Sequence, residues 1–353
     1  MKELEIYKNL KVVVTGSTGF KGSWLCFWLS SLKSNVVGIA LKPEPGSVIF
    51  DQLGLKKKIK QIYLDINNFE KLNKVIKKEK PDIIFHLAAQ SIVSLSFLKP
   101  TETIMTNVLG STNILETVRR NKVKNLVYIT SDKCYLNDGR STAYYENDIL
   151  GGEDPYSVSK ACAELVFQTY FNSLLINSEK LNYATTRAGN VIGGGDMKKD
   201  RIVPDVIKSL KYNTELVIRS PDSTRPWQHV LEPLSGYLLL GSLLINKKLS
   251  YKLKPNWNFG PSTTNCKTVL QVTKKIISIW GTKKNITIKR NKKFKEAGLL
   301  MLNNKKAKKE LNWSPKLSFD ETILMTVDWY KSFFKRKNIE RVSAEQIQYF
   351  SSK

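Results

Sequence analysis

Two groups of residues between positions 130 and 160 have the types and the spacing for acid–base chemistry. Tyr156 and Lys160 are one helical turn apart, so on a helix they share one face. A lysine ammonium there would lower the tyrosine pKa from about 10, and the phenolate could take a hydroxyl proton while a hydride leaves the same carbon. Ser131, Asp132 and Lys133 add a hydroxyl, a second acid and a second base. A simple dehydrogenase has no use for this second pair, whereas the elimination of water needs both.

A glycine-rich turn near the start of the sequence indicates a nucleotide site. The apolar run KVVVTG at 11–16 predicts a buried parallel strand, and the apolar run after residue 20 predicts a helix. Gly16 permits a tight turn, Gly19 lets the backbone approach a pyrophosphate, and Gly22 allows close packing of helix and strand. Free N–H groups at the helix start would bind the phosphates. This context favours a catalytic role for the tyrosine–lysine pair over two exposed residues on a helix.

Apolar runs alternate with amphipathic segments along the first half of the chain. This alternation predicts an α/β, Rossmann-type fold, in which a doubly wound parallel sheet has helices on both faces. The predicted strands are KVVVTG, NVVGIAL, KQIYLDI, PDIIFHLAA, NLVYITS and NYATTRAGNVIG. The predicted helices cover 20–32, 68–79, 100–121 and 156–175.

The pattern becomes irregular after about residue 195. A GGGD segment, a proline-containing helix start and a loop at 219–228 follow one another there. We therefore expect a dinucleotide-binding Rossmann domain over 1–195, to which the chain returns later. A smaller C-terminal substrate-binding lobe is expected mainly over 196–340, and residues 341–353 are expected to be a surface helix or tail.

Ten short segments, spread over most of the chain, match one known family. In chain order they are VTGSTGFKGSWL, DIIFHLAAQSIVSLS, TNVLGSTNILE, TSDKCY, GGEDPYSVSKACAEL, RAGNVIGGGD, DRIVPD, RPWQHVLEPLSGYL, WNFGP and KELNWSP. With these segments the chain resembles the extended short-chain dehydrogenase/reductases, in their nucleotide-sugar branch, and most closely the CDP-glucose 4,6-dehydratase family. The G-x-x-G-x-x-G turn and the Y-x-x-x-K pair mark only the superfamily, whereas RAGNVIGGGD and RPWQHVLEPL mark the dehydratase subgroup.

The resemblance implies a reaction on CDP-glucose with NAD as cofactor. Tyr156 would take the 4-hydroxyl proton as the hydride leaves C4, with Ser131 hydrogen-bonded to the 4-oxygen, and the new ketone acidifies the C5 proton. Lys133 would remove that proton, provided that burial or Lys160 keeps its amine neutral. A protonated Asp132 would give its proton to the leaving 6-hydroxyl before the hydride returns to C6. Many sugar-nucleotide dehydratases have glutamate where Lys133 stands, so the lysine indicates the CDP-glucose subgroup.

We expect the cofactor to lie along the glycine-rich turn and the ends of the neighbouring strands. Asp65 could bond an adenine amine, and the small residues at 87–89 let a strand end pass close to a flat ring. The alternatives are a strand-end turn for the first and plain core packing for the second. The expected cofactor-binding residues are Gly16, Thr18, Gly19, Phe20, Lys21, Gly22, Asp65, Ile66, Leu87, Ala88, Ala89, Tyr156 and Lys160.

One departure from the family pattern concerns the choice between NAD and NADP. In many NAD enzymes the second strand ends in an acid that binds the ribose 2′-hydroxyl. Here the strand ends Gly38-Ile-Ala-Leu-Lys42, and no acid occurs before Glu44. Lys42 could favour a 2′-phosphate, or it could be a solvated lysine. We expect the latter, and hence a preference for NAD.

Polar residues among apolar ones are candidates for binding the sugar nucleotide. Arginines suit a diphosphate because their forked guanidinium pairs with two oxygens, although a single arginine is often a surface salt bridge. Arg187 is one such candidate, and Asn107 is expected from the resemblance to hold the backbone near the site. The expected substrate-binding residues are Gln90, Asn190, Arg201, Arg219, Arg225 and His229.

Composition argues against several other classes of protein. The four cysteines show no C-x-x-C pairing and there are two histidines, so no metal site is expected. The net charge of +26 comes mainly from scattered lysines without interleaved aromatic residues, so we expect no nucleic-acid partner. No signal peptide and no apolar run of membrane-spanning length occur, which predicts a cytoplasmic enzyme without a membrane partner. The family habit is a homodimer formed by helices such as 100–121 and 156–175.

Three other functions stay open on the sequence. The chain could dehydrate a dTDP-, GDP- or UDP-sugar, because the base rests on resemblance alone. A 4-epimerase or reductase would use Tyr156 and Lys160 without elimination, but Asp132 and Lys133 argue against it. A cofactor-binding scaffold with a basic surface is the alternative without catalysis, and the complete catalytic set argues against that.

Overall fold

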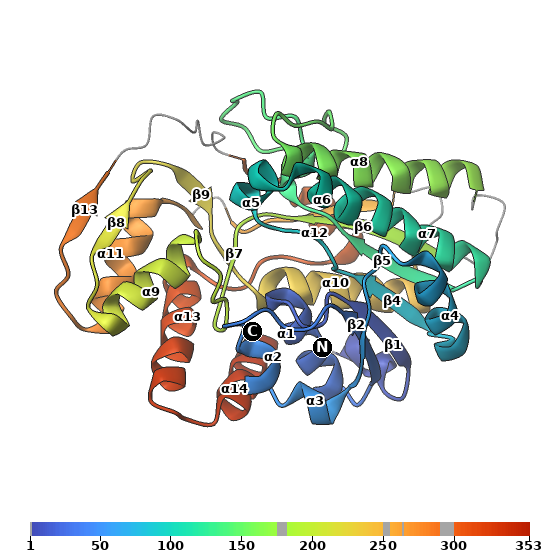
Figure 1. Cartoon of the computed structure of the whole chain (residues 1–353), viewed down its shortest axis with the longest axis horizontal. Coiled ribbons are helices and arrows are strands. Elements are labelled where there is room, and N and C mark those ends of the chain that lie inside the picture. The colour runs from blue at the N-terminus through green and yellow to red at the C-terminus, as the bar shows by residue number, and fades with distance from the viewer. Residues whose placement is uncertain (1, 175–181, 250–254, 263–264, 290–299) are drawn as a thin grey trace.

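A seven-stranded sheet in the order β11-β6-β5-β4-β1-β2-β3 forms the centre of the computed structural model (Figure 1). All neighbouring strands in it are parallel. The first six strands in the sequence, β1 to β6, have the spatial order of a doubly wound dinucleotide-binding sheet, so the predicted fold class is confirmed. The strands are β1 (Lys11–Thr15), β2 (Asn35–Ala40), β3 (Lys60–Tyr63), β4 (Ile83–His86), β5 (Asn125–Ile129), β6 (Asn182–Ala188) and β11 (Asn256–Phe259).

The structure describes residues 2–174, 182–249, 255–262, 265–289 and 300–353. Residue 175, the last residue of the helix predicted over 156–175, and all of a lysine-rich stretch at 291–297 lie outside these ranges. Within the described part of the chain, no helix is long and apolar enough to cross a bilayer.

All six predicted strands are present, and the seventh strand of the sheet was missed. β11 pairs with β6 from Asn256 opposite Thr185 to Phe259 opposite Ala188. Its sequence, NWNF, contains two asparagines, a residue type that is depleted in strands, so local propensity gives little signal. Packing decides instead, because Trp257 and Phe259 are both buried. The chain therefore returns to the sheet after its excursion into the second lobe.

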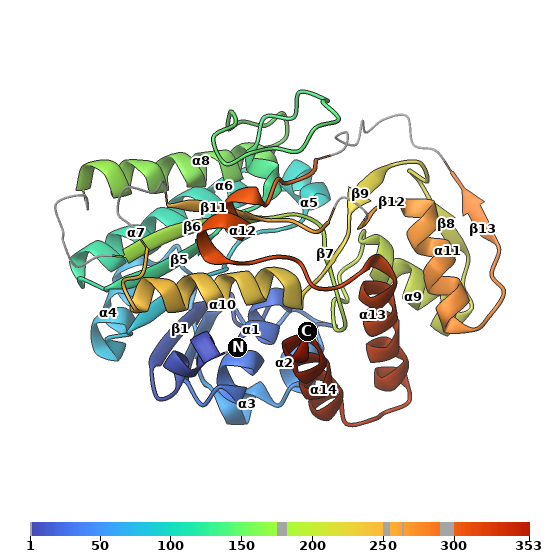
Figure 2. The ribbon, with the colours of Figure 1, turned by 180° about the vertical axis from the view of Figure 1, so that it is seen from behind.

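Helices cover both faces of the sheet. On one face lie α4 (Phe69–Glu79), α7 (Ser111–Arg120) and α8 (Pro155–Thr169), whose apolar side chains pack over β1, β4 and β5. On the other face lie α1 (Phe20–Ser31) and α10 (Leu231–Ile245), and Figure 2 shows α10 crossing the sheet. The shorter elements near the sheet are η1 (Lys2–Tyr7), α2 (Ile49–Gln52), α3 (Leu55–Lys58), α5 (Val93–Leu98), η3 (Asp132–Cys134), η4 (Tyr170–Leu174) and α12 (Lys305–Leu311).

The segment predicted as one helix over 100–121 is divided into three parts. It consists of α6 (Pro100–Ile104), a π-helical segment η2 (Met105–Gly110) and then α7. π-helical turns are rare and are often found at functional sites. Asn107 lies in this turn and is fully buried. The amphipathic pattern predicted helix correctly but could not reveal the change of winding.

A second lobe lies beside the carboxyl ends of the strands, at the left of Figure 1. Its small sheets pair β8 with β13, β9 with β12, and β7 with β10. Its elements are β7 (Val191–Ile192), α9 (Ile202–Tyr212), β8 (Leu216–Ile218), β9 (Thr224–Pro226), β10 (Gln228–His229), β12 (Cys266–Thr268), α11 (Val269–Trp280), β13 (Ile286–Ile288) and α13 (Phe319–Phe334).

The segment expected as a surface helix or tail belongs to a packed helix. α14 (Ile339–Ser352) buries Ile347 and Phe350. The Phe350 ring meets the Trp28 ring of α1 edge-on at a centroid distance of 5.9 Å. Residues 341–353 thus help to cover the helix that follows the glycine-rich turn.

A buried ion pair joins the sheet to α8. Arg187 on β6 is fully buried, and its guanidinium donates to both carboxylate oxygens of Glu164 on α8, at 3.0 and 2.9 Å. It also donates to the Tyr135 hydroxyl at 2.6 Å and to the Glu146 carbonyl at 3.0 Å. Burial alone would raise the pKa of Glu164, but Arg187 outweighs this and holds the pKa below its ordinary value. The prediction that Arg187 is a candidate for binding the diphosphate is wrong, because the side chain is fully buried and all three of its guanidinium nitrogens donate within the core.

Replacing Arg187 by methionine should destabilise the protein strongly, because it leaves the Glu164 carboxylate buried with only the Thr130 and Thr185 hydroxyls and no cation to balance its charge. We expect a loss of about 3–5 kcal/mol in the free energy of unfolding. Urea denaturation measures this loss. As a control, Arg119→Met removes an exposed partner of Glu116 on α7 and should cost at most about 1 kcal/mol. Similar losses in the two variants would contradict a special role for the buried pair.

Candidate active site

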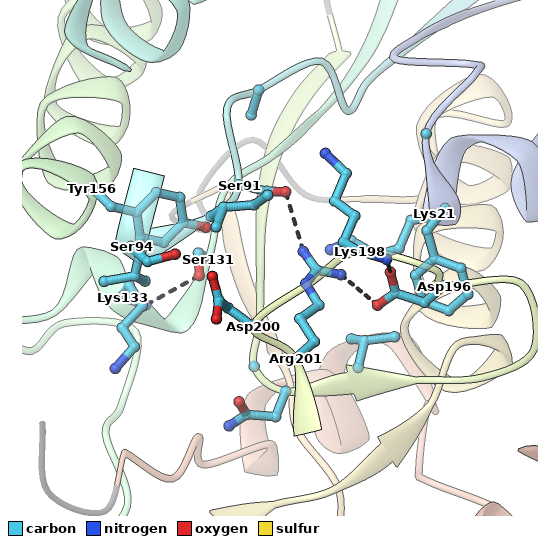
Figure 3. A pocket seen from close by; sticks show the side chains of 18 of the residues that line it. Lys21, Ser91, Ser94, Ser131, Lys133, Tyr156, Asp196, Lys198, Asp200 and Arg201 are labelled. Carbon is cyan, nitrogen blue, oxygen red and sulfur yellow. Dashed lines mark hydrogen bonds and ion pairs between the residues drawn. The ribbon is translucent and has the colours of Figure 1, made fainter. Parts of the chain in front are cut away.

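A large cavity separates the carboxyl ends of the strands from the second lobe. Its volume is about 1530 Å³. The glycine-rich turn, the ends of β2 to β6, the start of α8, and α9 and β8 of the lobe all contribute to its wall. Open α/β sheets bind their ligands at this edge. Figure 3 shows part of the cavity with its polar side chains.

The glycine-rich turn has the geometry of a phosphate cradle. Gly16 has a φ of +72°, and a Cβ there would lie 2.9 Å from the backbone nitrogen of Ala88. A Cβ at Gly22 would lie 2.0 Å from the carbonyl oxygen of Gly16, so neither position admits a side chain. No side chain caps α1, which leaves the N–H groups of its first turn for a ligand. The turn therefore fits the pyrophosphate of a dinucleotide.

Nearly all of the residues expected to bind the cofactor line this cavity. Those on its wall are Gly16, Thr18, Gly19, Phe20, Lys21, Gly22, Asp65, Ile66, Leu87, Ala88, Ala89 and Tyr156. Lys160 is not on the wall but is buried beneath it. The surroundings of Lys21 differ from those of a solvated lysine, because burial and the positive charge of Arg201 lower its pKa to about 8.

The start of α8 and the end of β5 bring Tyr156 and Ser131 together. Asp154 caps α8 by accepting hydrogen bonds from the N–H groups of Tyr156 and Ser157, and Pro155 occupies the first helical position. Ser131 likewise caps the short helix η3 by accepting from the Lys133 N–H. The side chains of Ser131 and Tyr156 both line the cavity, and Ser131 is close enough to lower the pKa of Tyr156 (Figure 3).

The charge state of Tyr156 differs from the expectation. Burial raises its pKa to about 12, and the hydrogen bond with Ser131 and the charge of Arg201 oppose this only in part. Lys160 is also buried, on the same helix and one turn after Tyr156. Its own pKa is lowered to about 8 by burial and by the Lys21 ammonium. Without a bound ligand, the cost of placing a phenolate in this buried position exceeds the stabilisation by neighbouring cations.

Asp132 has the surroundings of a proton donor. It is 4 % exposed, and burial raises the pKa of its carboxyl above the ordinary value. The Ser131 hydroxyl donates to one of its oxygens at 2.8 Å. A Cβ at Gly189 would lie 2.8 Å from the other oxygen, so the glycine of the RAGN segment makes room for the acid. Lys133 is half-buried, and in Figure 3 its ammonium points away from Tyr156.

Four of the six residues expected to bind the substrate line the cavity, namely Asn190, Arg201, Arg219 and Arg225. The other two do not. Contrary to the expectation, the Gln90 side chain is used within the fold, where it donates to Thr103 Oγ1 at 2.9 Å and to the Ile92 carbonyl at 3.1 Å. His229 is fully buried beside Trp24, and burial lowers its pKa to about 3. Both polar side chains looked functional in the sequence because burial within the fold is not visible there.

Asn107 holds the backbone at the end of β4, as expected. Its amide accepts from the Gln90 N–H at 2.8 Å and donates to the Gln90 carbonyl at 2.9 Å. It also donates to Ser159 Oγ on α8 at 2.9 Å. The π-helical turn thus fixes the strand end and α8 relative to each other.

Several polar residues on the wall were not predicted, among them the two hydrogen-bond partners of Arg201. Arg201 is held between Ser91, whose hydroxyl accepts at 3.2 Å, and Asp196, whose carboxylate accepts at 2.6 Å (Figure 3). Both partners belong to segments that matched the family, AAQSIV and GGGD, and this was the available signal. The unpredicted polar residues on the wall include Ser91, Ser94, Thr130, Asp196, Lys198, Asp200 and Asp205. Within the described ranges, no cluster of ligands that could hold a metal ion occurs.

Comparison with known proteins identifies the family. The family model described as GDP-mannose 4,6 dehydratase matches residues 13–326. The chain belongs to this family. It is 41% identical over 357 residues to CDP-glucose 4,6-dehydratase of Salmonella typhimurium, covering 100% of this chain and 99% of that protein. It is 25% identical over 347 residues to dTDP-D-glucose 4,6-dehydratase of Homo sapiens, covering 94% and 93%.

Solved structures of the same fold include related enzymes. A dTDP-glucose 4,6-dehydratase from Streptomyces venezuelae with NAD and TYD bound has a TM-score of 0.80 at 21% identity, covering 93% of this chain and 99% of that one. UDP-glucose 4-epimerase from Thermotoga maritima with UDP-glucose has a TM-score of 0.79 at 22% identity, covering 92% of this chain and 100% of that one. The fold is therefore shared by dehydratases and epimerases, and the residues of the site must distinguish them.

The position of Lys42 leads to a prediction about the dinucleotide. Lys42 is exposed at the edge of the cavity, next to Leu41, whose carbonyl accepts from Thr18 Oγ1 at 3.0 Å. An exposed lysine contributes little, so Lys42→Asp should change NAD affinity by no more than about twofold. NAD should bind more tightly than NADP to the unmodified protein. Calorimetric titration of both dinucleotides measures this, and an NADP preference that Lys42→Asp reverses would overturn the prediction.

Proposed function

We propose that this protein is a CDP-glucose 4,6-dehydratase, which converts CDP-glucose into CDP-4-keto-6-deoxyglucose and water. The observation that carries the proposal is the buried acid Asp132, which lies in the cavity wall beside Ser131 and Tyr156. Hydride transfer alone has no use for such an acid, whereas loss of water requires one. The match to a CDP-glucose 4,6-dehydratase over the whole of both chains supports the choice of cytosine.

The first step uses residues of α8 and η3. When bound, NAD accepts a hydride from C4 of the sugar and later returns it to C6. Tyr156 takes the proton of the 4-hydroxyl, and Ser131 donates a hydrogen bond that fixes the 4-oxygen. The buried Lys160 lies one turn behind Tyr156 and, when protonated, compensates the phenolate charge. The high pKa of Tyr156 in the ligand-free protein keeps the proton in place until the substrate arrives.

The second step is the elimination of water. Lys133 removes the C5 proton, which the 4-ketone has made acidic, after its side chain turns into the cavity. Burial raises the pKa of Asp132 and so favours its protonated form, and the acid gives its proton to the 6-hydroxyl as this group leaves. The Lys133 amine and the Asp132 carboxyl are adjacent in sequence, so one short helix positions the base and the acid.

The sugar nucleotide also needs a site for its diphosphate. Arg201, Arg219 and Arg225 line the lobe side of the cavity. Asp196 and Ser91 fix the guanidinium of Arg201, so less side-chain entropy is lost when an anion binds. We assign the diphosphate to these arginines.

We further propose a cytoplasmic homodimer. Apolar side chains are exposed on α6, η2 and α8, where the family pairs its helices: Ile104, Met105, Leu109, Val158 and Leu165. The four cysteines are free, as in a reducing compartment. Sedimentation of the purified protein tests the dimer.

Incubation with four sugar nucleotides tests the proposed activity. CDP-, dTDP-, GDP- and UDP-glucose are supplied separately, and mass spectrometry follows the loss of one water. We expect CDP-glucose to be the best substrate. A product of unchanged mass would instead indicate a 4-epimerase, and a better reaction with another nucleotide would reassign the base.

Replacing Lys133 by methionine should block elimination but not the first hydride transfer. Substrate should then reduce the bound nicotinamide, which stays reduced and is seen by its near-ultraviolet absorbance. Lys198→Met is a matched control, since Lys198 also lines the cavity but is paired with Glu44 at 3.5 Å. The control should still release the dehydrated product. Normal product formation by Lys133→Met would remove this lysine from the mechanism.

A further inference from the structure

The lobe end of the cavity contains a carboxylate that the reaction does not use. Asp205 is in the first turn of α9, is half-buried and lines the cavity. Among the described residues, its side chain makes no hydrogen bond or ion pair. Its acidic neighbours are engaged, because Asp196 is paired with Arg201 at 2.6 Å and Asp200 with Arg219 at 3.5 Å. Asp205 is therefore available to a ligand.

The wall around Asp205 suits a flat ring. Val217 and Ile218 of β8 and Val269, the first residue of α11, line the same cavity. α9 packs against both β8 and α11, so these aliphatic side chains and Asp205 belong to one compact group of elements. Aliphatic side chains can cover the two faces of a flat ring. A carboxylate can accept hydrogen bonds only from donor groups at the edge of that ring.

The direction of the sugar nucleotide follows from the two ends of the cavity. Tyr156 at the sheet side fixes the hexose, and Arg201 and Arg219 fix the diphosphate. The base must then lie beyond these arginines, in the lobe formed by α9, β8 and α11 (Figure 1). This step rests on the proposed function.

We propose that Asp205 accepts a hydrogen bond from the 4-amino group of cytosine and so selects a CDP-sugar. Carboxylates recognise this amino group in other settings by the same donor–acceptor match. Uracil and thymine carry a carbonyl oxygen at position 4, which would face the carboxylate as a second acceptor. Both the hydrogen bond and the favourable charge interaction are lost with these bases.

The charge state of Asp205 gives the selection a pH dependence. Burial is the main cause that raises the pKa of Asp205 to about 6, and the negative charges of Asp200 and Asp196 act in the same direction. The positive charges of Lys208 and Arg219 oppose the rise. Above that value the carboxylate accepts from cytosine. Below it the protonated group can donate to the 4-oxygen of uracil, so the preference for cytosine should fall as the pH is lowered through about 6.

Steady-state kinetics with CDP-glucose and UDP-glucose test the assignment. In Asp205→Asn, the ratio of kcat/KM for the two substrates should fall about tenfold to a hundredfold, because an amide can face either base. The loss should appear mainly in the KM for CDP-glucose. Asp200→Asn is the matched control, since it removes another carboxylate of the same wall and should keep the ratio.

Titration of CMP and UMP into the protein separates this inference from the proposed function. Neither nucleotide reacts, so tighter binding of CMP, lost in Asp205→Asn, supports the role of Asp205 even if no sugar nucleotide is dehydrated. Failure of dehydration would refute only the proposed function. Equal weakening of CMP and UMP in the variant would show that Asp205 contacts the ribose or supports the lobe, and would overturn the inference.

Discussion

The ion pair between Arg187 and Glu164 is the constraint on which the site depends. It joins β6, α8 and, through Tyr135, the segment that follows η3. Tyr156 lies on α8, Asp132 in η3 directly before that segment, and Gly189, which makes room for Asp132, directly after β6. Removal of two charges from water is costly, and here the cost is met by four hydrogen bonds from one guanidinium. The pair thereby fixes the relative positions of the elements that carry Tyr156 and Asp132, which the proposed mechanism places at C4 and C6 of the sugar.

Burial shifts the pKa values of four titrating groups of the site toward their neutral forms. It raises the pKa values of Tyr156 and Asp132 and lowers those of Lys21 and Lys160. Each shift favours the neutral form of its group. Before substrate binds, burial therefore makes these acids hold their protons more tightly and makes the amines release theirs more readily. In the proposed mechanism the elimination needs a protonated acid, and burial favours the protonated form of Asp132, one oxygen of which also accepts from the Ser131 hydroxyl at 2.8 Å.

The sequence predicted the sheet because its strands are short apolar runs, and it predicted the phosphate turn because Gly16 and Gly22 are required by close backbone contacts. It could not predict β11, whose strand conformation depends on packing against β6. His229 and Arg187 were placed in the site because polar residues stand out in a sequence, whereas their burial depends on contacts between distant segments. Asp205 was missed for the opposite reason, since an acid in the first turn of a helix needs no explanation.

The contact between Trp28 and Phe350 has a consequence for folding. It joins α1, which begins at the phosphate turn, to α14, and most of the chain lies between them. Contacts of such sequence separation form late, because closing a long loop costs chain entropy. During synthesis α1 would expose Trp28 until α14 emerges. Partly made chains would therefore present an apolar helix to chaperones and proteases, and the cofactor site would mature among the last parts of the molecule.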